Sequence, residues 1–86
     1  LSLSFQYYFY IEAEDIPGVM ASITSMFAEK KIGIESIVQK DYLKENMVPI
    51  VLITDPFVER DHEDLNKNIL NLEAVHEVRS IRIETD

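Results

Sequence analysis

The chain has 86 residues, of which 47% are apolar and 28% charged, and this composition is typical of one globular domain. Its formal net charge of -8 would repel a phosphate backbone, so nucleic-acid binding is not expected. The chain has no cysteine, which excludes disulfides and thiolate metal sites and fits a cytoplasmic protein. The longest apolar run, residues 48–53, is too short to cross a membrane.

Residues 1–5 lack the basic start and the cleavage pattern of a signal peptide. We interpret them as a cut end or a linker before one domain over residues 6–86. Within that domain, alternating apolar residues predict a strand over 6–14. A helix is expected over 17–31, because apolar residues recur there at three- and four-residue spacing. That stripe contains Ile16, Val19, Met20, Ile23, Met26 and Phe27.

The second half of the chain repeats this order with different residues. Strands are predicted over 32–40 and 47–54, joined by a polar hairpin loop, with Pro49 near the start of its strand. Asp61 has the chemistry of an N-cap for a second helix, whose buried stripe is Leu65, Ile69 and Leu72. A last strand is predicted over 75–84. The order β-α-β-β-α-β predicts an α+β, ferredoxin-like sandwich with a four-stranded antiparallel sheet and two helices on one face.

The sheet face without helices should be polar in an isolated domain, but here it is not. If Phe9 and Ile11 face the helices, Tyr8 and Tyr10 point away from them. Strands that are apolar on both sides indicate cover on both sides, and the predicted interface residues are Tyr8, Tyr10, Ile37, Met47, Val51 and Ile53. The alternative is that tyrosines simply suit strands.

The stretch Glu-Asp-Ile-Pro-Gly-Val-Met, residues 14–20, stands between the first strand and the first helix. Pro17 suits a first helical turn, and Asp15 could accept hydrogen bonds from the first-turn amides. Gly18 is unexpected inside a helix and points to close approach of a ligand or a neighbouring backbone. Free amides attract a carboxylate and Asp15 an ammonium, so the loop would suit a free amino acid. The alternative is a capped helix start with an incidental glycine.

Other candidate groups favour structural roles. Gly33 fits a helix-to-strand turn that needs unusual backbone angles, with close approach in a pocket as the alternative. His62 and His76 have no ligand companions and are expected to be solvent-exposed imidazoles rather than metal ligands. The acids around residues 59–64 fit a solvated helix face. No catalytic machinery or metal motif is found, so the chain alone is not expected to be an enzyme.

These residues resemble a known family. Asp15-Ile-Pro-Gly-Val after a strand, then a helix ending in Phe27-Ala-Glu-Lys-Lys-Ile-Gly-Ile, is similar to an ACT domain, a small ligand-sensing module of enzymes of amino-acid metabolism. Residues 34–40 and 48–54 resemble the C-terminal ACT domain of homoserine dehydrogenase. The resemblance implies a parent enzyme that reduces aspartate semialdehyde to homoserine with NAD(P)H. The cofactor would belong to catalytic parts that this chain lacks.

The resemblance also implies a homodimer or higher oligomer, with the amino-acid effector where the first loop of one copy meets the second strand of the next. Carried over by position, the effector residues are Asp15, Ile16, Gly18, Val19, Met20, Gly33, Ile34 and Glu35. Effector-binding members often carry a polar side chain at the position of Gly33. Its absence here favours a mainly oligomerising role. Threonine is the first effector to test, by pathway logic.

Four alternatives are open at this point. The chain could be the ACT domain of another enzyme, or a dimerising module without an effector. An RNA-binding domain has the same topology, and Tyr8 and Tyr10 could stack bases, but the strand 47–54 lacks the expected basic and aromatic pattern. An acylphosphatase-like enzyme would need a cationic phosphate cradle, which the first loop does not offer.

Overall fold

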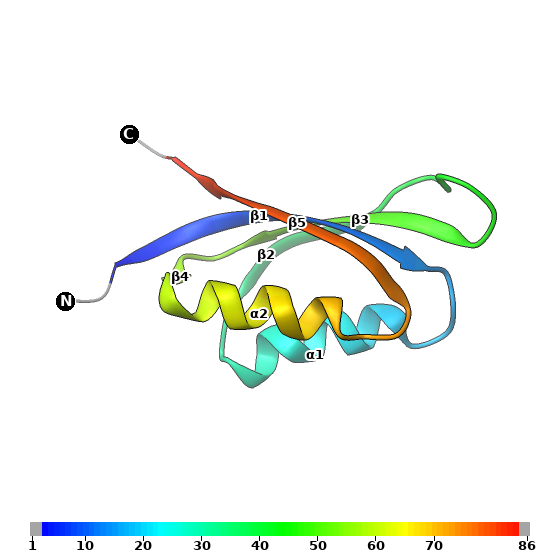
Figure 1. The fold of residues 1–86 in the computed structure, drawn as a ribbon. Coiled ribbons are helices and arrows are strands. Elements are labelled where there is room, and N and C mark those ends of the chain that lie inside the picture. Colours follow the sequence, from blue (N-terminus) through cyan, green and yellow to red (C-terminus); the bar gives the residue numbers. More distant parts are fainter. Residues whose placement is uncertain (1–2, 85–86) are drawn as a thin grey trace.

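A computed structural model describes residues 3–84 and contains two helices against one face of an antiparallel sheet (Figure 1). The strands are β1 (Ser4–Glu14), β2 (Ile34–Gln39), β3 (Met47–Thr54), β4 (Phe57–Val58) and β5 (Val75–Ile83). The helices are α1 (Val19–Glu29) and α2 (Arg60–Leu70). This confirms the ferredoxin-like sandwich. No helix among the described residues is long and apolar enough to span a membrane.

The sheet has five strands rather than the four predicted from the sequence. β1 lies in the centre, with β3 and then β2 on one side, and it also pairs with β5. The additional strand, β4, follows the break at Asp55 and Pro56 and pairs with Ser4 and Phe5 at the start of β1. Ser4 and Phe5 therefore belong to the sheet and not to a linker; Leu1 and Ser2 lie outside the described residues.

The core lies between the sheet and the helices. Phe9 and Ile11 are fully buried there, and the ring of Phe9 meets that of Phe27 edge-on at 5.4 Å. Val19, Ile23 and Phe27 are the buried face of α1, and Leu65 and Ile69 that of α2, as the periodicity predicts. Ile16, which was expected in the same stripe, is 46% exposed because it precedes the helix.

Pro49 occupies a central strand without costing it a cross-strand hydrogen bond to β1. Asp15 N–H donates to Asn46 O at 2.8 Å. Counting from this pair, every second pair of facing residues in β1 and β3 is hydrogen-bonded, and the Glu12–Pro49 pair is not one of them. The missing N–H of Pro49 therefore faces β2, at the point where β2 ends. Lys40 N–H still donates to Pro49 O there, at 2.8 Å.

Both helix starts differ from the sequence-based expectation. α1 begins at Val19 with Gly18 as its N-cap and no side-chain cap, so Asp15 does not cap it and Pro17 lies before it. α2 has Glu59 as N-cap, and Asp61, expected there, lies in the first turn with Glu63, where carboxylates favour the positive end of the helix.

The reasons why Gly18 and Gly33 are glycines are the reverse of those expected from the sequence. Gly18 has φ +86°, and a Cβ added there would meet nothing within 4 Å, so backbone conformation alone requires glycine. Gly33 is not in a positive-φ conformation; its missing side chain makes room for Asp55, whose Oδ2 would clash with a Cβ. The left-handed residue after α1 is Lys31, with φ 58°.

These reasons predict different costs for alanine at the two positions. Gly18→Ala should lower the free energy of unfolding by about 1–2 kcal/mol, because alanine is strained at positive φ. Gly33→Ala should cost less than about 1 kcal/mol, since the exposed Asp55 side chain can rotate away. Urea unfolding followed by circular dichroism measures both. Equal losses in the two variants would contradict the assignment.

His62 is half-buried and not the exposed imidazole expected. Its ring stacks on that of Tyr7 at 4.2 Å, and its Nε2 lies 2.7 Å from Ser80 Oγ on β5. Burial lowers the pKa of His62, against the opposing effect of Glu59 and Glu63. His76, by contrast, is exposed and pairs with Glu14 at 2.7 Å.

The lowered pKa of His62 predicts a pH dependence of stability. As pH falls below about 6.5, the unfolded chain binds a proton at His62 before the folded chain does, so the folded state loses stability. The loss ends once pH is below the folded-state pKa. Melting temperatures at pH 7.5 and pH 5 should therefore differ more in the wild type than in His62→Gln. A His76→Gln variant keeps His62 and should keep its contribution; an unchanged fall in His62→Gln would refute the prediction.

Candidate functional site

The first candidate site is the loop between β1 and α1. Because Gly18 provides no side-chain cap, the first turn of α1 keeps unpaired amides. Val19 N–H is not one of them, since it donates a hydrogen bond to Ile16 O at 3.3 Å. Among residues 3–84, no group accepts a hydrogen bond from the backbone N–H of Met20 or of Ala21. Free N–H groups and the positive end of the helix dipole favour an anionic group such as a carboxylate.

Asp15 lies on this loop, held by the hairpin between β2 and β3. Its backbone N–H donates to Asn46 O, and its carboxylate accepts a hydrogen bond from Tyr42 Oη. That hydrogen bond raises the pKa of the Tyr42 phenol. Tyr42 was not among the residues predicted for the site. It comes from a polar loop 27 residues away, and no local pattern indicates the contact.

A cavity of about 350 Å³ opens beside the same loop, on the side of the α2–β5 turn. Three of the predicted effector residues line it: Ile16, Gly18 and Val19. The other lining residues are Glu14, Pro17, Ser22, Leu72, Glu73 and Ala74. Asp15 and Met20 are not among them. The turn residues 72–74 were missed because the pairing of β5 with β1, continued by the Glu14 N–H to Ala74 O bond at 2.8 Å, brings them here from a distant part of the sequence.

The remaining predicted effector residues, Gly33, Ile34 and Glu35, lie at the opposite end of α1. Eleven helical residues, about 16 Å, separate the two groups within one chain. Ile34 packs against the core, and Glu35 accepts a hydrogen bond from Gln6 at 3.0 Å. A single chain therefore does not assemble the predicted effector set.

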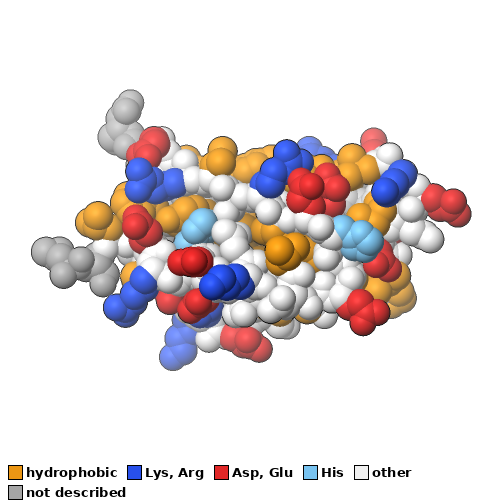
Figure 2. Space-filling view, viewed as in Figure 1, with side chains coloured by type: hydrophobic (Ala, Val, Ile, Leu, Met, Phe, Trp, Pro, Cys, Tyr) orange, Lys and Arg blue, Asp and Glu red, His pale blue; other side chains and the backbone are white. Residues whose placement is uncertain are grey.

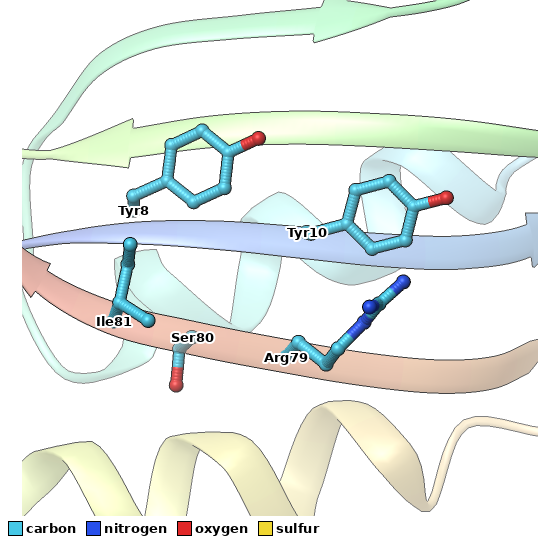
Figure 3. Close-up of a pocket in the computed structure, with 5 residues that line it drawn as sticks. All are labelled: Tyr8, Tyr10, Arg79, Ser80 and Ile81. Atoms are coloured by element: carbon cyan, nitrogen blue, oxygen red, sulfur yellow. The ribbon is translucent and has the colours of Figure 1, made fainter.

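The second candidate site is the sheet face opposite the helices. Tyr8, Tyr10 and Ile81 lie on this face with Arg79, and together with Ser80 they line a shallow hollow of about 430 Å³ (Figure 3). Ile81 is 65% exposed. Apolar side chains are visible along the sheet side of the molecule, interrupted by charged ones (Figure 2). The charged group on this face, Arg79, interacts with residues of the same chain. Its guanidinium lies over the Tyr10 ring at 4.6 Å and contacts Glu77 at 2.6 Å.

Register explains which predicted interface residues reach this face. Tyr8 pairs with Ile53 and Tyr10 with Val51, so these four side chains share it. Ile37 was assigned to it wrongly. A register shift between Ile34 and Ser36 turns Ile37 to the helix side, where it packs against the core, and places the 46% exposed Val38 outward. Met47 is only 6% exposed, so it is already covered within the chain.

Comparisons with known proteins agree with this architecture. The chain is 37% identical over 83 residues to homoserine dehydrogenase from Pseudomonas aeruginosa, covering 91% of this chain and 18% of that protein. A crystal structure of a homoserine dehydrogenase from Thiobacillus denitrificans superposes with TM-score 0.84 and 33% identity, over 96% of this chain and 18% of that one. The ACT domain from GTP pyrophosphokinase of Chlorobium tepidum has TM-score 0.71 at 21% identity, covering 91% and 99%. No protein-family model matches the chain.

The chain thus has the fold of an ACT domain, and the resemblance predicted from the sequence is confirmed. More particularly, the chain resembles a part of homoserine dehydrogenase. The chain spans less than a fifth of the length of those relatives.

Proposed function

We propose that this chain is the regulatory domain of a homoserine dehydrogenase and binds a free amino acid, threonine being the first candidate, at an interface between two copies. The observation that carries the proposal is the uncapped start of α1 next to Asp15. An α-amino acid presents a carboxylate, which suits the free amides, and an ammonium group, which suits the Asp15 carboxylate. The reduction of aspartate semialdehyde with NAD(P)H would take place in other parts of a cytoplasmic parent enzyme.

The proposed homodimer pairs two β2 strands edge to edge. β2 has only one charged residue, Glu35, whereas the other edge strand, β5, carries Glu77, Arg79 and Arg82, and charges discourage edge pairing. Since Lys40 N–H points to β3, the N–H groups of Ile37 and Gln39 point to the free edge. They are available as donors to a second copy.

An antiparallel, two-fold pairing of β2 would also unite the two halves of the predicted effector set. It places the Gly33 end of one β2 beside the Gln39 end of the other. The Gln39 end lies next to the first loop of its own chain, because the hairpin that follows it contacts Asp15. Gly33, Ile34 and Glu35 of one copy would thus approach the first loop of the second copy.

The experiment is sedimentation velocity of the chain with and without each of a panel of amino acids, with titration calorimetry for any that respond. Threonine is expected to shift the assembly, since a ligand that binds one state more tightly shifts the population toward it. N-acetylthreonine, which lacks the ammonium group, should not. A purely dimerising module would assemble through β2 with no response to any amino acid, and the lack of a side chain at Gly33 is the feature that favours this second candidate.

A further inference from the structure

Asp55 occupies the place that a side chain at position 33 would fill. A Cβ added to Gly33 would clash with Asp55 Oδ2 and would lie 3.1 Å from its Cγ. The absence of a side chain at Gly33 thus leaves room for the Asp55 carboxylate at an exposed end of β2. A charged group is present at this end of the strand although residue 33 itself has no side chain.

The backbone around Asp55 is held in place while its carboxylate is not engaged. Asp55 N–H donates to Gly33 O at 2.9 Å, and Pro56 follows, which restricts the backbone of both residues. Within residues 3–84, the Asp55 side chain makes no hydrogen bond or ion pair that would use its charge. An exposed carboxylate on a fixed backbone, with no use inside the chain, is available to a ligand.

We propose that Asp55 completes the amino-acid site from the second copy and holds the ammonium group of the ligand together with Asp15 of the first. The inference rests on the proposed β2 pairing, which brings the Gly33 end, and Asp55 with it, to the first loop of the other chain. Two carboxylates approaching each other in a chain of net charge -8 repel unless a cation lies between them. Oδ2 of Asp15 is engaged by Tyr42, so Asp15 offers its other oxygen and Asp55 supplies a second acceptor.

Titration calorimetry of the chain with L-threonine tests the proposal. Asp55→Asn keeps the shape of the side chain and removes its charge, and it should raise the Kd for threonine at least about tenfold, the usual effect of losing one charged hydrogen bond. Asp15→Asn should do the same. The control is Asp64→Asn, which removes an exposed acid from α2 and should bind as the wild type does. Melting temperatures confirm that all variants are folded.

Mixing the two weakened variants separates a shared site from a site within one chain. After exchange of subunits in an equal mixture of Asp15→Asn and Asp55→Asn, about half of the dimers are mixed, and each has one intact site of two. About a quarter of the wild-type binding sites should therefore return. A site built within one chain would recover none.

The outcomes of these experiments test the role of Asp55 separately from the proposed binding of an amino acid. No binding of threonine or any other amino acid to the wild type overturns both. Binding that is lost in Asp15→Asn but unchanged in Asp55→Asn overturns only the role of Asp55 and leaves the effector site at the first loop. Loss in both variants with no recovery in the mixture rules out the contribution from a second copy.

Discussion

Replacing Phe27 with alanine is expected to remove about 3–5 kcal/mol from the free energy of unfolding. Phe27 is fully buried on α1, and its ring meets Phe9 of the central strand edge-on at 5.4 Å. The truncation would leave a cavity between α1 and the sheet. A domain of this size has roughly 4–13 kcal/mol of stability in total, so the variant should be largely or wholly destabilised at 37 °C.

Urea unfolding followed by circular dichroism at fixed protein concentration measures this effect. Leu70→Ala is the matched control, because Leu70 is 52% exposed on α2 and its loss should change stability by no more than about 0.5 kcal/mol. If Phe27→Ala does not fold, Phe27→Leu keeps most of the volume and should still cost about 1 kcal/mol. Equal midpoints for Phe27→Leu, Leu70→Ala and wild type would show that the α1 contact does not stabilise the domain.

Replacing Gln39 with proline is expected to disrupt the proposed dimer while leaving the domain folded. The N–H of Gln39 points to the free edge of β2, so proline removes no hydrogen bond to β3. In a two-fold interface each substitution counts twice. The loss of two hydrogen bonds of about 1 kcal/mol each raises the dimer dissociation constant about thirtyfold, before any clash of the rings.

Sedimentation velocity across a range of concentrations gives the dissociation constant. Arg82→Pro makes the same change on the opposite edge strand, β5, where the N–H of residue 82 also points outward. Its dimer should remain intact. A stable dimer in Gln39→Pro together with dissociation in Arg82→Pro would place the interface on β5 and refute the pairing through β2.

The order of strands and helices could be predicted from the sequence because it depends on local periodicity. Phe9 and Ile11 alternate with Tyr8 and Tyr10, and the structure places the two pairs on opposite faces of β1. Val19, Ile23 and Phe27 recur at helical spacing and are buried as expected. The position of the first candidate site, between a strand and a helix, follows from the same order.

The face on which a strand residue lies was predicted wrongly where the strand pairing shifts by one residue. The shift between Ile34 and Ser36 turns Ile37 from one face of the sheet to the other, because successive side chains in a strand alternate. The brief strand β4 was missed for a related reason. It is only two residues long and follows a proline, so it has no periodicity of its own.

The sequence by itself determined the fold of this protein and its resemblance to homoserine dehydrogenase. Those properties depend on the spacing of apolar residues and on a short motif, both of which are local. Only the tertiary structure decided why Gly18 and Gly33 are glycines, which group Asp15 contacts, and how far His62 is buried. Some of these features depend on a partner that is distant in the sequence, as Gly33 depends on Asp55 and Asp15 on Tyr42, and Gly18 depends on one backbone angle. The pattern of neighbouring residues encodes neither a distant partner nor a backbone angle.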